Sequence, residues 1–179
     1  MPSCRLPVAI SRARIARTVQ KLSRQIDLYA RSNSISELCV ICVLDAAFVF
    51  SADLIRAMKT PTTIVFLKAR SYDGIRSGKL SLARLPKEVH GRPVLVVDTV
   101  YDTGRTIAKV LREVRKRSST TALVILVEKA GKAEAPPVPS DVQTFVGIRL
   151  AGDPFMVGYG LDVSGRFRHL KDIRIYSAF

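Results

Sequence analysis

Residues 95–106 read LVVDTVYDTGRT, and this stretch decides the fold. The apolar run PVLVVD (93–98) has the length of a strand, and the apolar spacing after Arg105 predicts a helix that ends near residue 117. A strand that is apolar at nearly every position is typical of a parallel sheet covered on both faces. Polar residues after such a strand are expected at the carboxyl edge of the sheet, where open α/β sheets bind ligands.

The residues between this strand and the helix have the composition of a phosphate site. Gly104 allows a tight turn or the close approach of a ligand. The amides of residues 103–106, the hydroxyls of Thr103 and Thr106, and the N-terminus of the helix near Arg105 are expected to converge on an anion. The spacing is not that of a Walker loop, and a single glycine does not make a dinucleotide fingerprint.

Two carboxylates, Asp98 and Asp102, accompany this predicted phosphate site. Acids in this place can accept ribose hydroxyls, hold Mg²⁺ or take a proton. The structural alternative is that Asp98 ends the strand and Asp102 caps the helix. Spacing alone leaves both interpretations open.

The rest of the chain repeats the alternation of strand and helix, which predicts an α/β fold with a central, mostly parallel sheet flanked by helices. The predicted helices cover residues 9–31, 46–58 and 105–117, and the predicted strands cover 38–44, 62–69, 93–98, 121–127, 144–150 and 172–179. The polar segment 70–86 is long for a connection, which predicts a short hairpin or a mobile functional loop. No repeat or linker divides the 179 residues, so a single domain is expected.

The chain is strongly basic, with 29 Lys and Arg against 15 Asp and Glu and a net charge of +14. This charge favours anionic partners, either small phosphorylated substrates or nucleic acid. Nucleic acid is the less favoured, because aromatic residues do not interleave with a basic run. No apolar stretch approaches the roughly 20 residues of a membrane span. An odd number of cysteines (Cys4, Cys39 and Cys42) without a signal peptide predicts a cytoplasmic location.

Two segments carry a resemblance to a known family. VLVVDTVYDTGRT resembles the phosphoribosyl-pyrophosphate (PRPP) signature of type I phosphoribosyltransferases, and FVGIRLAGDPFMVGYGLDVSGRFRHL (145–170) resembles the hypoxanthine-guanine, or 6-oxopurine, branch. The likeness runs in the expected order from about residue 38 to 177. It implies one type I phosphoribosyltransferase domain with a core of about 35–150, a hood from the N-terminal segment and about 151–179, and a mobile loop of about 70–86.

The resemblance also implies an activity. Such an enzyme transfers the 5-phosphoribosyl group of PRPP to N9 of hypoxanthine or guanine, which forms IMP or GMP and releases pyrophosphate in purine salvage. It uses Mg²⁺ as cofactor and normally associates as a homodimer or homotetramer.

The family motif assigns roles around PRPP. Asp102 matches the catalytic acid near purine N7, and Arg168 matches an arginine that contacts pyrophosphate. Ser71 and Tyr72 match a pair in the mobile loop that closes over the reacting centre. The residues that match the 5-phosphate loop are Thr103, Gly104, Arg105 and Thr106.

The resemblance assigns a second group of residues to the purine and the metal. Lys129 matches the lysine that recognises the 6-oxo group, to which an ammonium can donate. Phe155 matches the aromatic that stacks on the base, and the backbone of Met156 contacts the base edge. Asp98 matches an acid that holds the ribose hydroxyls directly or through Mg²⁺, and Asp162 matches an acid near a second metal and the exocyclic edge of the base.

The chain departs from the family pattern at two important places. Thr99 stands where a second acid is usual; it can bond a ribose hydroxyl but brings no charge to a metal. The pyrophosphate loop Leu44, Asp45 and Ala46 replaces the common Leu-Lys-Gly, so an anion stands where a cation is usual and is expected to weaken PRPP binding unless it points away or ligates Mg²⁺. Pro154 replaces a common lysine, a minor change. These departures keep open a non-catalytic homologue that binds purine nucleotide as a regulatory or partner protein, and the net charge keeps open an RNA-binding regulator.

Overall fold

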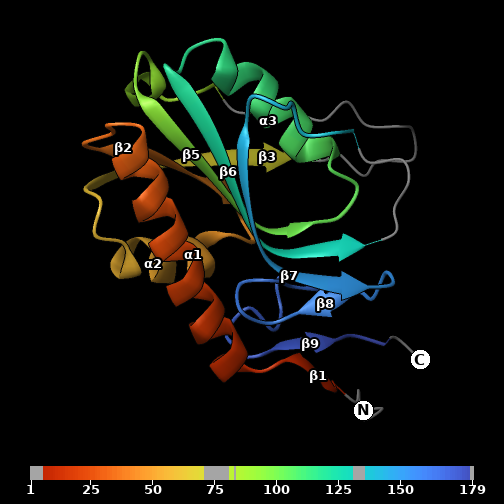
Figure 1. Ribbon diagram of the computed structural model, residues 1–179. Helices are drawn as coiled ribbons and strands as arrows, with labels where there is room; N and C mark the ends of the chain where they lie inside the picture. The colour runs from red at the N-terminus through yellow and green to blue at the C-terminus, as the bar shows by residue number, and fades with distance from the viewer. Residues whose placement is uncertain (1–5, 71–80, 83, 131–135, 178–179) are drawn as a thin grey trace.

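A six-stranded sheet forms the centre of the molecule (Figure 1). The computed structural model describes residues 6–70, 81–82, 84–130 and 136–177. The strand order is β4-β3-β2-β5-β6-β7, and the strands run parallel except for β4, which is antiparallel to β3. The strands are β2 (Leu38–Leu44), β3 (Thr62–Arg70), β4 (Ser81–Leu82), β5 (Pro93–Tyr101), β6 (Thr120–Ala130) and β7 (Gln143–Ala151).

Helices cover both faces of this sheet, with α1 (Arg12–Ser32) and α2 (Phe48–Ala57) on one side and α3 (Arg105–Arg115) on the other (Figure 1). A short 3₁₀ helix, Lys87–Val89, precedes β5. Alternate residues of each central strand enter opposite layers, so Val97 packs with the α1–α2 layer while Val96 packs with the α3 layer. Two buried faces explain why the strands are apolar at nearly every position. Within the described parts of the chain, no helix is long and apolar enough to span a membrane.

A second, three-stranded sheet joins the two ends of the chain in the order β1-β9-β8 (Figure 1). Its strands are β1 (Val8–Ile10), β8 (Met156–Val157) and β9 (Ile173–Ile175). The predicted helix start near residue 9 is wrong, because Val8 and Ile10 pair with β9 and the side chain of Ser11 caps α1 by accepting from the Arg14 amide at 3.4 Å. The predicted strand 172–179 is shorter in the structure, and residues 178–179 lie outside the described part.

Strands β5 and β6 both run further than the apolar pattern predicts. Val100 pairs with Val127, and Tyr101 pairs with Glu128, so Asp98 does not end its strand. β6 continues to Ala130, where it still pairs with β7. Backbone pairing does not depend on the polarity of the side chains, which is why the apolar runs end before the strands do. The polar residues of the signature therefore lie inside and just beyond β5.

The segment 70–86 is described only in part. Ser81–Leu82 pairs antiparallel with Ala69–Arg70, which adds the edge strand β4 beside β3. Ser71 and Tyr72, assigned to a mobile loop from the sequence, lie outside the described residues. Their role stays a prediction.

Candidate active site

The turn between β5 and α3 has the geometry of an anion site. Gly104 occupies the N-cap position with φ 68° in the left-handed region, and no side chain among the described residues caps the helix. The first turn of α3 contains no acidic residue, and the amides and the positive end of the dipole at a helix N-terminus favour an anion. Thr103 and Arg105 are exposed on this turn and Thr106 is half-buried. The alternative in which Asp102 caps the helix is wrong, because Gly104 holds that position.

A lysine and two carboxylates meet at the carboxyl edge of the sheet. Lys129 Nζ lies 3.5 Å from Asp102 Oδ2 and 2.7 Å from Asp153 Oδ1, and the lysine side chain is only 8% exposed. The long β6 strand carries Lys129 past the end of β5, where Asp102 follows Tyr101. The structure thus joins the predicted purine lysine to the predicted catalytic acid.

Asp153 was missed from the sequence. It lies two residues after β7, and β7 runs parallel to β6 with Leu150 opposite Lys129. Residues that follow neighbouring parallel strands meet at the same edge of the sheet, so the parallel pairing of β6 and β7 indicates that Asp153 lies near Lys129. This indication requires the position at which β6 ends, which the sequence did not predict.

Phe155 lies on the surface of this edge rather than in the core. Its side chain is 53% exposed, and its ring meets the ring of Tyr176 edge-on with centroids 5.9 Å apart. The Tyr176 amide also donates to the Phe155 carbonyl at 2.8 Å. Met156, the next residue, is buried in β8. An exposed ring held from its edge leaves a face for stacking on a flat base.

Arg168 and Asp162 are paired with each other. Arg168 Nη2 lies 2.9 Å from Asp162 Oδ1, and Nη1 donates to the Gly160 carbonyl. Asp162 Oδ2 accepts from the Gly165 amide at 2.7 Å. The arginine assigned to pyrophosphate and the acid assigned to a second metal therefore form one ion pair in this structure.

The turn Leu44–Asp45–Ala46 follows β2, and its Leu44–Asp45 peptide bond is cis. The Asp45 carboxylate lies 3.9 Å from Lys68 Nζ on β3, and both side chains are about half exposed. Lys68 pairs with Leu44 in the parallel register, which places it beside the turn. A cation thus stands next to the anion that the sequence placed at the pyrophosphate loop, although an exposed pair of this kind contributes little stability. Lys68 was also missed from the sequence.

Thr99 is fully buried in β5. Its hydroxyl donates to the carbonyl of Ala46 at 3.1 Å, and its amide donates to Asp98 Oδ1 at 2.7 Å. The predicted contact with a ribose hydroxyl is not available from this arrangement, because the side chain has no exposed surface. The positions that depart from the family pattern, Thr99 and Ala46, touch each other.

Asp98 is a half-buried carboxylate inside β5. Burial raises its pKa to about 7, although hydrogen bonds from the amides of Thr99 and Val100 act in the opposite direction. A neighbouring cation would favour its ionised form. The described residues contain no group of three or more His, Cys, Asp or Glu that could hold a metal by themselves. Mg²⁺ commonly binds through one or two carboxylates together with substrate phosphates and water, and Asp98 fits this arrangement.

Comparison with known proteins agrees with this geometry. Residues 10–157 match the family model described as phosphoribosyl transferase domain. The hypoxanthine phosphoribosyltransferase of Salmonella typhimurium is 35% identical over 91% of this chain and 90% of its own length. The hypoxanthine-guanine phosphoribosyltransferase of Mycobacterium avium is 32% identical over 94% of this chain and 87% of its own length.

Solved structures give the same result. The crystal structure of a hypoxanthine-guanine phosphoribosyltransferase from Bacillus anthracis matches with a TM-score of 0.80 and 30% identity over 98% of this chain and 99% of that chain. The predicted type I phosphoribosyltransferase fold and transferase class are thereby confirmed. The chain belongs to the phosphoribosyltransferase family, in the hypoxanthine-guanine branch that its two motifs resemble.

Proposed function

We propose that this protein is a purine salvage enzyme that transfers the 5-phosphoribosyl group of PRPP to N9 of hypoxanthine or guanine. One observation carries the proposal: Lys129 Nζ lies 3.5 Å from Asp102 Oδ2 beside the N-terminus of α3. A 6-oxopurine presents O6 and N7 side by side on one edge. An ammonium can donate to O6 while the neighbouring carboxylate accepts a proton from N7. Adenine carries an amino group at this place and offers the lysine no acceptor.

The remaining residues bind and orient the substrates. The amides of residues 103–106 hold the 5-phosphate, Phe155 stacks on the base and Arg168 contacts the pyrophosphate. The bond between C1′ and pyrophosphate oxygen breaks, the N9–C1′ bond forms, and Asp102 accepts the proton that the purine loses. Asp98 would hold Mg²⁺, which when bound would supply positive charge near the ribose and pyrophosphate. The protein acts mainly by positioning and by electrostatic stabilisation.

The family resemblance supplies the remaining parts of the proposed function. Ser71 and Tyr72 lie outside the described residues, and the loop role that the resemblance gives them stays a prediction, as does the place of Asp162 near a second metal. The chain is one domain with the core, hood and loop limits expected from the sequence. Apolar side chains exposed on the helices, Leu28 of α1 and Phe48 of α2, support association as a homodimer or homotetramer. A cytoplasmic location stays a prediction.

A steady-state assay with PRPP, Mg²⁺ and hypoxanthine, guanine or xanthine tests the proposal. We expect IMP or GMP to form, and Asp102→Asn to lower kcat about a hundredfold, since a positioned base typically contributes this much. A folded protein that forms no nucleotide from any of these bases would contradict the proposed function. Nucleotide binding by calorimetry without turnover would then favour the non-catalytic homologue. Steeply salt-dependent binding of RNA that nucleotide does not compete for would favour the RNA-binding regulator.

A further inference from the structure

The Thr99 side chain connects two segments that are far apart in the sequence. It is fully buried, and its hydroxyl donates to the Ala46 carbonyl at 3.1 Å across 53 positions of the chain. Ala46 lies in the turn between β2 and α2, and Thr99 lies in β5, which neighbours β2 in the sheet. A hydroxyl in this position holds the carbonyl of the turn against the strand.

The same carbonyl also borders the C-terminal segment. Gly160 has φ 93°, and a Cβ atom at this glycine would overlap the Ala46 carbonyl oxygen. The Gly160 carbonyl accepts from Arg168 Nη1, and the Gly160 amide donates to the Arg168 carbonyl at 3.0 Å. A displaced Ala46 carbonyl would therefore clash with Gly160, the residue to which Arg168 is hydrogen-bonded.

We infer that Thr99 is a positioning residue for the pyrophosphate side of the site. Its hydroxyl fixes the position of the Ala46 carbonyl. The carbonyl in turn fixes the position of Gly160, to which the guanidinium of Arg168 is hydrogen-bonded. The inference rests on the proposed function, because it assumes that Arg168 and the 44–46 turn face pyrophosphate. It assigns Thr99 a structural contact in place of the ribose contact expected from the sequence.

The same contact explains why a threonine suits position 99 better than an acid. An ionised carboxylate has no proton to donate to a carbonyl oxygen, and a buried carboxylate is costly without a partner. Threonine donates one hydrogen bond and brings no charge into β5. The partner atom is the main-chain carbonyl of Ala46, so replacement of Thr99 by an acid should remove this hydrogen bond and impair the site.

Thr99→Val and Thr99→Ser test the hydroxyl separately from the shape of the side chain. We expect Thr99→Val to raise KM for PRPP about five- to tenfold, the effect of one lost buried hydrogen bond, while KM for hypoxanthine stays within about twofold. Thr99→Ser keeps the hydroxyl and should return KM for PRPP to within about twofold of wild type. Thr121→Val is the matched control, because Thr121 is also buried, with its hydroxyl 2.7 Å from that of Ser118 near the opposite end of the sheet.

Hydrogen exchange of the 44–51 segment gives a readout that does not need activity. Thr99→Val should speed exchange there relative to wild type, whereas Thr99→Ser and Thr121→Val should not. Unchanged KM for PRPP in Thr99→Val would overturn the inference, as would a Thr99→Ser variant as impaired as Thr99→Val. If the wild type forms no nucleotide, the proposed function fails separately. In that case equal exchange in Thr99→Val and Thr99→Ser overturns the positioning role, and faster exchange in Thr99→Val alone supports it.

Discussion

At the scale of single residues, the site depends on one lysine placed between two carboxylates. Lys129 is almost fully buried, and its ammonium lies within 3.5 Å of Asp102 and Asp153. A buried ammonium requires such partners, because an unpaired buried charge is costly. A purine base that binds here must offer a hydrogen-bond acceptor that replaces part of the interaction between the Lys129 ammonium and the two carboxylates, as a 6-oxo group does.

We predict that Lys129→Met raises KM for hypoxanthine by about ten- to a hundredfold and changes KM for PRPP little. A hydrogen bond from a charged donor is worth about 1.5–3 kcal/mol, which gives this range. Steady-state kinetics with each substrate varied in turn measures the effect. Lys109→Met on α3 removes a lysine outside the proposed site and should leave both constants unchanged. A Lys129→Met enzyme with unchanged KM for hypoxanthine would remove the basis for the proposed base selectivity.

Gly104 and Gly91 allow backbone strain to be separated from steric overlap. Both have φ near 70°, but a Cβ at Gly104 would overlap the Tyr101 side chain, whereas a Cβ at Gly91 has nothing within 4 Å. Gly91→Ala should cost about 1–2 kcal/mol, the strain of the left-handed conformation alone. Gly104→Ala should cost clearly more and raise KM for PRPP. Urea unfolding of both variants measures the difference. Equal losses of stability would show that the Tyr101 side chain can move aside without a further loss of folding free energy.

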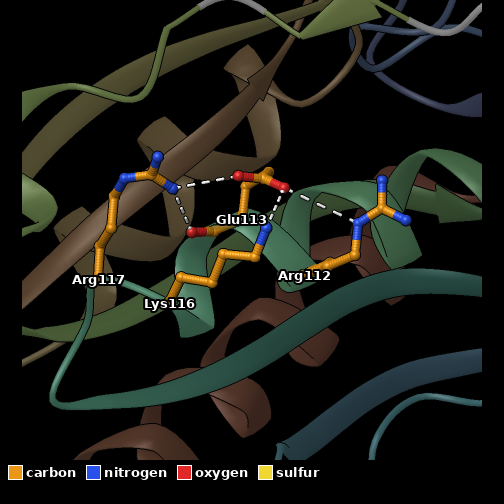
Figure 2. Close-up of polar contacts among 4 residues, drawn as sticks. All are labelled: Arg112, Glu113, Lys116 and Arg117. Carbon is orange, nitrogen blue, oxygen red and sulfur yellow. Dashed lines mark hydrogen bonds and ion pairs between the residues drawn. The ribbon is translucent and has the colours of Figure 1, made fainter.

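At the scale of elements, the C-terminal end of α3 concentrates positive charge around one acid. Figure 2 shows Glu113 surrounded by Arg112, Lys116 and Arg117. Hydrogen bonds from Lys116 and then Arg117 hold the pKa of Glu113 below its ordinary value. Cations at this end suit the helix dipole, and the carboxylate relieves the repulsion among them.

This cluster gives a prediction for the pH dependence of stability. A lowered pKa in the folded state means that the carboxylate stabilises the fold above its unfolded pKa and loses this contribution as the pH falls through the folded value. Glu113→Gln should therefore lower Tm slightly at pH 7, and the difference from wild type should shrink as the pH falls below the ordinary pKa of a glutamate, about 4.3. Thermal unfolding from pH 3 to 8 measures it. A difference that does not shrink as the pH falls, or that persists in about 1 M salt, would indicate a cause other than ion pairing.

At the scale of the whole molecule, the small sheet of the terminal segments is part of the main core. Ile10 of β1 and Ile173 of β9 are fully buried in the cluster that also contains Leu22 of α1 and Leu126 of β6. The Asp172 carboxylate also accepts from the Arg12 amide at the start of α1, at 2.7 Å. The segment that carries Phe155 and Arg168 is thereby tied to the body of the molecule at β8, β9 and α1.

We predict that Ile173→Ala destabilises the whole protein by about 2–4 kcal/mol, as is usual for a buried large-to-small change. Val8→Ala, at a position 49% exposed in β1, should change stability by no more than about 0.5 kcal/mol. Both variants should unfold in one cooperative transition. If Ile173→Ala produced a separate early transition, the terminal sheet would unfold independently of the main sheet.

The amino-acid sequence by itself predicted the main helices, the central strands and a candidate phosphate turn. Apolar runs predicted the four central parallel strands, and the glycine with its threonines predicted the phosphate turn, because these signals are local. The resemblance assigned roles to Asp102 and Lys129, and the structure brings these two residues together.

The tertiary structure decided the features that depend on register between distant segments. These are the pairing of β1 with β9, the ends of β5 and β6, and the partners Asp153, Lys68 and Ala46. Thr99 is the clearest case: the sequence marked it as a departure, but only the contact with Ala46 indicates what its hydroxyl does. The physical reason is that a hydrogen bond across 53 positions leaves no periodic pattern in the sequence of either segment.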